Sequence, residues 1–193
     1  MSAVSRVRPW GGLVTVFTMT AIAPGPDPLR AQDHSQHQQA AAGRIDPSWL
    51  SFDSASRTVR FKLIAGLTGQ VKSPFNFNGF VDGELTLVVP ESATVVLDFV
   101  NEDGTPHSAV VIADKDPMPN MADTPAIPRA FTTKAAEGLG YYARDVVRFR
   151  AAPAGAYRIF CGVPGHGLSG MWIRFRVDPG VTRPELVLTQ GKT

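Results

Sequence analysis

Apolar and polar residues alternate with a period of two along much of the chain. In residues 58–64, the apolar Val59, Phe61 and Leu63 alternate with basic or hydroxyl-bearing residues, which is the pattern of a strand with one buried face. Similar short stretches recur between turn-forming residues. We expect strands at residues 49–52, 58–64, 84–89, 93–101, 107–112, 145–150, 157–161 and 171–177.

Asp98 indicates which face of its strand is buried. It is the one charged residue in the stretch 93–101, so we expect its side chain to face solvent. The alternation then turns Val95, Leu97 and Phe99 toward the interior.

Turn-forming residues separate the expected strands, with 18 glycines and 16 prolines among 193 residues. Asp103-Gly104 lies between two expected strands and predicts a hairpin turn. Residues 130–139, just after Pro128, favour one short helix within a connecting loop. Short strands, frequent turns and little helical periodicity predict an all-β fold, an antiparallel β-sandwich or barrel of about eight strands.

The first 31 residues have the organisation of an export signal. Arg6 and Arg8 form a basic start, and residues 11–23 form an uncharged apolar core that is shorter than the roughly 20 residues needed to span a bilayer. We expect this signal peptide to be cleaved after Ala31, and we therefore expect a periplasmic or otherwise extracytoplasmic protein. An uncleaved membrane anchor is the alternative.

The rest of the chain divides into three parts. Residues 32–44 are polar and glutamine-rich and predict disorder, residues 45–178 hold every expected strand and predict one domain, and residues 179–193 predict a C-terminal tail. The formal net charge of +2 gives no reason to expect a nucleic-acid partner. We expect a monomer that associates with a membrane only if the N-terminal segment stays uncleaved.

The residues with the clearest chemistry lie between the last two expected strands. Residues 161–171 hold the only cysteine, one of four histidines and a methionine in the spacing C-x4-H-x4-M, namely Cys161, His166 and Met171. A thiolate, an imidazole and a thioether on one loop suit a soft or borderline metal ion, copper above all. Metal binding also explains a single thiol in an exported protein, where cysteines are normally paired.

Strand parity places these ligands relative to the interior. Cys161 and Met171 each share a face with the apolar residues of their own strands, so both side chains point inward. His107 is the one other histidine at an expected strand end. A trigonal plane of His107, Cys161 and His166, with Met171 as a long axial ligand, is the pattern of an electron-transfer copper site.

Three stretches carry a resemblance to a known family. They are Phe75-Asn76-Phe77-Asn78-Gly79, Pro106-His107-Ser108, and Cys161-Gly162-Val163-Pro164-Gly165-His166 with Ser169-Gly170-Met171. With these stretches, residues 45–178 resemble a cupredoxin, and within that fold the sulfocyanin and rusticyanin branch of the blue copper proteins. Four residues between the cysteine and the histidine set this branch apart from plastocyanin-like loops, which have two. We expect the aromatic residues of the first stretch to cover the core.

The resemblance implies four ligands to one type 1 copper ion: His107, Cys161, His166 and Met171. It also implies a hydrogen bond from Ser108 near the cysteine sulfur. By the same resemblance the protein is an electron carrier rather than an enzyme, and it shuttles single electrons between extracytoplasmic redox partner proteins through the Cu(I)/Cu(II) couple. His166 lies in a Gly- and Pro-containing loop next to Leu168, so we expect redox partners to dock near these two residues.

Three alternatives to an electron carrier remain to be weighed. A periplasmic copper carrier or chaperone needs exposed, exchangeable sites, for which the Gln32-Asp33-His34 terminus left by cleavage and the Met118/Met121 pair are candidates. A copper enzyme needs further histidines, and only His34 and His37 remain, both in the N-terminal segment. A structural zinc site is disfavoured because a thioether is a poor zinc ligand. A cysteine buried between strands favours a retained metal, and hence the electron carrier.

Overall fold

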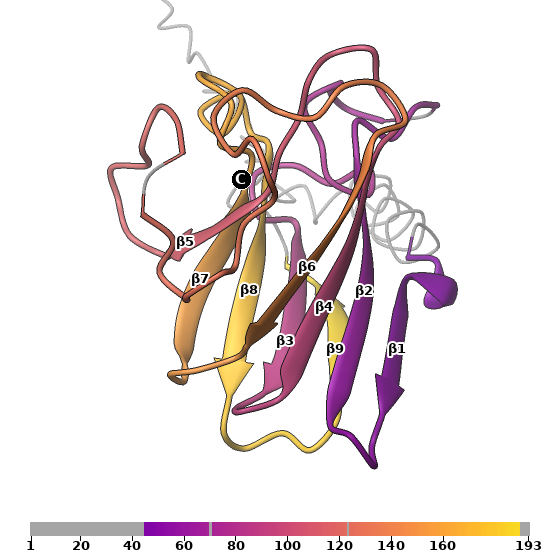
Figure 1. The fold of residues 1–193 in the computed structure, drawn as a ribbon, viewed down its shortest axis with the longest axis vertical. Helices are drawn as coiled ribbons and strands as arrows, with labels where there is room; N and C mark the ends of the chain where they lie inside the picture. The colour runs from indigo at the N-terminus through magenta and orange to yellow at the C-terminus, as the bar shows by residue number, and fades with distance from the viewer. Residues whose placement is uncertain (1–44, 70, 123, 190–193) are drawn as a thin grey trace, which may run out of the picture. The chain divides into compact units, whose positions relative to one another are not determined.

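The computed structural model describes residues 45–69, 71–122 and 124–189, which form nine strands and one short 3-10 helix (Figure 1). All eight expected strands are present within a few residues, although the fifth begins at Val110 rather than at His107. The elements are η1 (Pro47–Trp49), β1 (Leu50–Asp53), β2 (Thr58–Ala65), β3 (Leu85–Pro90), β4 (Thr94–Asn101), β5 (Val110–Ala113), β6 (Arg144–Arg150), β7 (Gly155–Phe160), β8 (Trp172–Asp178) and β9 (Glu185–Leu188).

The strands form two sheets, which confirms the predicted β-sandwich. Sheet A has the strand order β1-β2-β4-β6, and sheet B has the order β5-β7-β8-β3-β9. One difference from the prediction is that β2 pairs with β4, and β3 with β8, in parallel. The parallel pairing of β2 and β4 arises because the intervening β3 lies in the other sheet, so the chain crosses over before it returns in the same direction.

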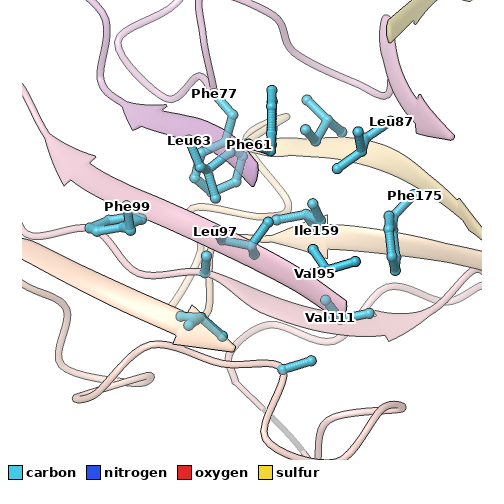
Figure 2. Packing of buried hydrophobic residues seen from close by; sticks show 14 of the residues in the cluster. Phe61, Leu63, Phe77, Leu87, Val95, Leu97, Phe99, Val111, Ile159 and Phe175 are labelled. Atoms are coloured by element: carbon cyan, nitrogen blue, oxygen red, sulfur yellow. The ribbon is translucent and has the colours of Figure 1, made fainter. Parts of the chain in front are cut away.

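The space between the sheets is filled by apolar side chains from both of them (Figure 2). Phe61 and Leu97 from sheet A share one cluster with Ile159 and Phe175 from sheet B, and each is at most 1% exposed. Asp98 faces outward as expected, where it pairs with an arginine of β2 at 3.4 Å. Burial of side chains of this size contributes about 1.5–3 kcal/mol each, so this core stabilises the frame that carries the site.

The turn predicted at Asp103-Gly104 does not form a hairpin. β4 belongs to sheet A and β5 belongs to sheet B, so the segment between them carries the chain from one sheet to the other. Asp103 is held in this crossing because its N–H donates to Asn101 Oδ1 at 2.9 Å and its own Oδ1 accepts from Thr105 N–H at 3.1 Å. The crossing leads directly to His107.

The predicted helix at residues 130–139 is also wrong. The segment contains a single turn, closed by a hydrogen bond from Gly138 N–H to Lys134 O at 2.7 Å. The residues that flank this turn, Phe131 and Leu139, form β-bridges with residues near β5. These long-range backbone contacts replace the local ones that a helix needs.

The segment predicted as a C-terminal tail, residues 179–193, contains a strand. Residues 185–188 form β9, which pairs antiparallel with β3 at the edge of sheet B. The predicted signal peptide, residues 1–31, and the predicted disordered segment, residues 32–44, lie outside the described residues. Among the described residues, no helix has the length and apolar character needed to cross a bilayer.

Candidate metal centre

The loop between β7 and β8 lies at one end of the two strands (Figure 1) and is closed at its base by backbone hydrogen bonds. Cys161 N–H donates to Met171 O at 3.0 Å, and Met171 N–H donates to His166 O at 3.1 Å. Gly165 and Gly170 have φ angles of 82° and 94°, a region that glycine adopts without steric cost. The loop therefore folds His166 back toward the ends of β7 and β8, next to Cys161 and Met171.

His107 reaches the same place from the segment before β5. Its backbone is fixed by a pair of hydrogen bonds with Leu139, at 3.1 and 2.7 Å. His107 and Cys161 have no exposed surface, whereas His166 is partly exposed. The structure thus brings together three of the four residues predicted as ligands.

The three potential donor atoms form a nearly regular triangle. His107 Nδ1 and His166 Nδ1 are 3.2 Å apart, and Cys161 Sγ lies 3.9 Å from the former and 3.6 Å from the latter. A point equidistant from all three atoms lies about 2.1 Å from each, close to the lengths of metal–imidazole and metal–thiolate bonds. The donor set and its spacing therefore fit one copper ion in a trigonal plane.

Asp103 orients the ring of His107. With the ring proton on Nε2, that nitrogen donates to Asp103 Oδ2 at 3.3 Å, which leaves the lone pair of Nδ1 directed at the centre. Burial raises the pKa of Asp103, but hydrogen bonds from Thr105 N–H and from His107 outweigh it, so the net pKa is lowered. The carboxylate is therefore charged at neutral pH.

Burial also sets the protonation states of the three donors. It lowers the pKa of His107, against the opposing effect of Asp103, and lowers the pKa of His166, with a further contribution from His107. Burial raises the pKa of the Cys161 thiol, and a hydrogen bond from Ser108 N–H opposes this in part. In the metal-free protein the imidazoles are ready to bind, whereas the thiol must release a proton first.

Ser108 makes the contact with the cysteine sulfur that the resemblance implied. Its N–H donates to Cys161 Sγ at 3.4 Å. Its hydroxyl donates to Ala135 O at 2.6 Å and accepts from Gly162 N–H at 3.0 Å. Ser108 thus links the first histidine, the cysteine and the turn at residues 134–138.

The side chains of the Phe75–Gly79 stretch lie partly in the core, as predicted, and partly at the metal site. Phe77 is buried in the core as expected, but Phe75 packs against the histidines, with its ring centroid 4.6 Å from that of His166. Asn76 and Asn78 are buried and hydrogen-bond to backbone groups of Leu67, Ile64 and others. The asparagines hold the stretch on β2, and Phe75 covers the site.

The methionines differ in their surroundings. Met171 is fully buried and belongs to the main core cluster, which confirms the strand parity inferred for it. Met118 packs against the small cluster around Phe160, whereas Met121 is exposed. Met118 and Met121 therefore do not share one environment. His34 and His37 lie outside the described residues.

A two-sheet β-sandwich with two histidines and one cysteine converging at one end defines a cupredoxin, the class of small blue copper proteins that carry electrons. The comparisons with known proteins narrow this class. The model of the sulfocyanin (SoxE) domain family matches residues 47–188, so the chain belongs to the sulfocyanin family. Cupredoxins bind one copper ion, and the cluster of His107, Cys161 and His166 has the donor set and spacing that fit a type 1 copper site.

Individual proteins are similar to parts of this chain. The sulfocyanin of Sulfolobus acidocaldarius is 28% identical over 144 residues, which cover 71% of this chain and 72% of that protein. Among solved structures, auracyanin B is similar at a TM-score of 0.46, with 25% identity over 63% of this chain and 88% of that one. Rusticyanin from Thiobacillus ferrooxidans is similar at a TM-score of 0.43, with 24% identity over 73% of this chain and 93% of that one.

Proposed function

We propose that the protein shuttles single electrons between extracytoplasmic redox partners, with His107, Cys161 and His166 as the equatorial ligands of copper and Met171 as the axial ligand. The observation that carries this proposal is the convergence of the three donor atoms around one point at bonding distance. When bound, copper supplies the one-electron Cu(I)/Cu(II) couple.

The protein holds each donor of this set in place. Each donor is held by groups outside the triangle: His107 by Asp103, Cys161 by Ser108, and His166 by the turn that begins at Val163 O, to which its N–H donates at 3.1 Å. A geometry fixed in this way changes little between two oxidation states, so electron exchange requires little rearrangement. Phe75 packs against both histidine rings and so reduces the access of water to them.

The axial role of Met171 is supported by burial and by backbone geometry. Met171 has no exposed surface, and its N–H and C=O groups are bonded to the two other residues of the same loop that we assign as ligands. A buried thioether at the end of a ligand loop has no solvent-facing role, and a weak axial sulfur is the usual fourth partner of a His2Cys plane.

Electron exchange with partners is proposed to occur through His166. Its ring is the one exposed donor of the three, and Leu168 beside it is 59% exposed. An apolar contact here lets a partner approach without having to desolvate charges. A Leu168→Asp variant should slow reduction by a partner protein while the visible spectrum stays unchanged. Unchanged partner kinetics would show that docking occurs elsewhere.

The test of the proposed function is copper uptake followed by visible spectroscopy. Purified protein that lacks the predicted signal peptide should give an intense thiolate-to-copper band with Cu(II), and the band should bleach and return through repeated reduction and oxidation. The complex should also resist a mild chelator, because the cysteine is fully buried. A colourless complex, or rapid loss of copper to the chelator, would instead identify a periplasmic copper carrier.

A further inference from the structure

The outer face of sheet B carries a network of ion pairs that lies apart from the metal donors. Arg158 on β7 donates through Nε to Asp114 Oδ1 at 2.5 Å and through both Nη atoms to Asp116 Oδ1 at 3.1 Å. Arg174 on β8 donates to the other oxygen of Asp114 at 3.4 Å. The Arg158 side chain is only 8% exposed, so its guanidinium is shielded from solvent, unlike that of an ordinary surface pair, while Asp116 lies at the exposed edge of the network.

The network lies beside one end of the ligand loop. The ring of Trp172 has the guanidinium of Arg158 at 4.7 Å and that of Arg174 at 5.4 Å from its centroid. Trp172 directly follows Met171 in the chain and pairs across the strands with Phe160, the residue before Cys161. The arginines therefore stack on the strand ends from which the loop departs and to which it returns.

Phe160 carries this support into the loop itself. Its ring belongs to a small buried cluster on the outer face, against which Trp172 and Met118 pack. The ring also lies where any side chain on Gly167 would have to go, so it contacts the backbone of the residue next to His166. A substitution at Gly167 would push the loop away from sheet B.

The segment 114–122 connects the ion pairs to the loop. It begins with the two aspartates that Arg158 binds, and it ends against the loop. There Gly165 N–H donates to Asn120 O at 2.8 Å, and Ala122 N–H donates to Gly162 O at 2.7 Å. Gly162 follows Cys161 and Gly165 precedes His166, so this segment grips the loop on the stretch between two donors.

We infer that Arg158 is a positioning residue for His166, which acts through the segment 114–122. The inference rests on the proposed function, since its purpose is to keep the second histidine at one place in both oxidation states. Among the described residues, removal of a shielded guanidinium leaves Asp114 with only the longer bond to Arg174 and leaves Asp116 without a paired cation. The start of the segment is then released, and the loop opens more often.

The first measurement uses copper-free protein. In Arg158→Gln, amide hydrogen exchange at Ala122 and Gly165 should be about tenfold faster or more, because both bonds depend on the segment that Arg158 holds. Arg176→Gln is the matched control: Arg176 also lies on the outer face of sheet B and pairs with Asp178 at 3.3 Å, but it is 51% exposed. This control should leave both amides unchanged.

The second measurement uses copper-loaded protein. Arg158→Gln should broaden or shift the thiolate-to-copper band and slow electron self-exchange, whereas Arg176→Gln should do neither. Arg158→Lys should have a smaller effect than Arg158→Gln on the band and on self-exchange, since lysine keeps the charge but lacks the planar fork that binds two carboxylates at once. Such a graded response distinguishes positioning from a general loss of stability.

The aspartates give a second route if Arg158→Gln fails to fold. Asp114 is 20% exposed and bonded to two arginines, while Asp116 is 84% exposed. Asp114→Asn should therefore accelerate exchange at Gly165 more than Asp116→Asn. The inference is overturned if the variants lower the free energy of unfolding but leave these amides and the copper band as in Arg176→Gln. A wild-type protein without a copper band would overturn the proposed function instead, while the copper-free exchange data would still decide whether Arg158 holds the loop.

Discussion

Asp103→Asn should raise the reduction potential, because it removes one negative charge near the metal and keeps an oxygen that accepts from His107 Nε2. His107 Nε2 lies 3.3 Å from Asp103 Oδ2, and the width of the imidazole ring and one metal–nitrogen bond add to this distance, so the carboxylate is about 7 Å from the metal position. With an effective dielectric constant of about 20, a unit charge at about 7 Å interacts by about 2 kcal/mol. That energy corresponds to about 100 mV for a one-electron couple.

Solvent reduces this estimate, since the Asp103 side chain is partly exposed. We therefore expect an increase of about 50–100 mV. The assay is voltammetry or redox titration of the copper-loaded protein at neutral pH, where the lowered pKa of Asp103 keeps it charged in the wild type.

The control for this experiment is Glu102→Gln. Glu102 is the adjacent acid, but the carboxylate that contacts His107 is that of Asp103. The control should shift the potential less than Asp103→Asn does. Equal shifts would indicate a long-range charge effect, and an unchanged potential in Asp103→Asn would refute the reasoning about this contact.

Three further predictions follow from the same structure. Met171→Leu should keep the thiolate-to-copper band and raise the potential, because loss of a sulfur donor destabilises Cu(II) more than Cu(I); loss of the band would contradict the axial assignment. Leu97→Ala should lower the free energy of unfolding in urea by about 2–5 kcal/mol with the band intact, since this side chain is 1% exposed in the core; a cost under about 1 kcal/mol would show that the core collapses around the gap. Copper uptake near pH 7 should release one proton, because the raised pKa of Cys161 keeps the thiol protonated and the lowered pKa values of the histidines keep them neutral. Affinity should therefore rise with pH up to the pKa of the thiol, and a dye-based titration that finds no released proton would contradict this.

The sequence predicted the strands and the donors for different reasons. The eight strands were predictable because an alternating pattern reports burial directly, as Asp98 and its apolar neighbours illustrate. The meeting of His107, Cys161 and His166 was predictable because the chain has one cysteine and four histidines, and His107 is the one histidine outside the loop that lies at an expected strand end.

Features that depend on distant contacts were not predictable. Asp103-Gly104 has the composition of a hairpin turn, yet the chain changes sheets there, and composition carries no information about which strand comes next in space. The helix predicted at 130–139 does not form because residues of this segment form β-bridges with residues in and near β5. β9 was missed because four residues after Pro184 give too short a pattern.

Two residues at the site were missed for a similar reason. Asp103 lies four positions before His107, a spacing that has meaning on a helix but none in a loop, so nothing local identified it as a partner. Phe75 was expected to cover the core with its neighbours, and only the three-dimensional structure shows that its ring meets His166. In both cases the contact is created by the crossing of chain segments at one end of the sandwich.

X-ray absorption at the copper edge, recorded on oxidised and reduced protein, tests the central claim most directly. The structure predicts one sulfur and two imidazole nitrogens at about 2.0–2.3 Å in both states, with small changes in distance on reduction. The same experiment on Cys161→Ser should show no short sulfur. A wild-type spectrum without a short sulfur, or with a different number of close ligands in the two states, would contradict the assignment of His107, Cys161 and His166 as the ligands of an electron-transfer copper site.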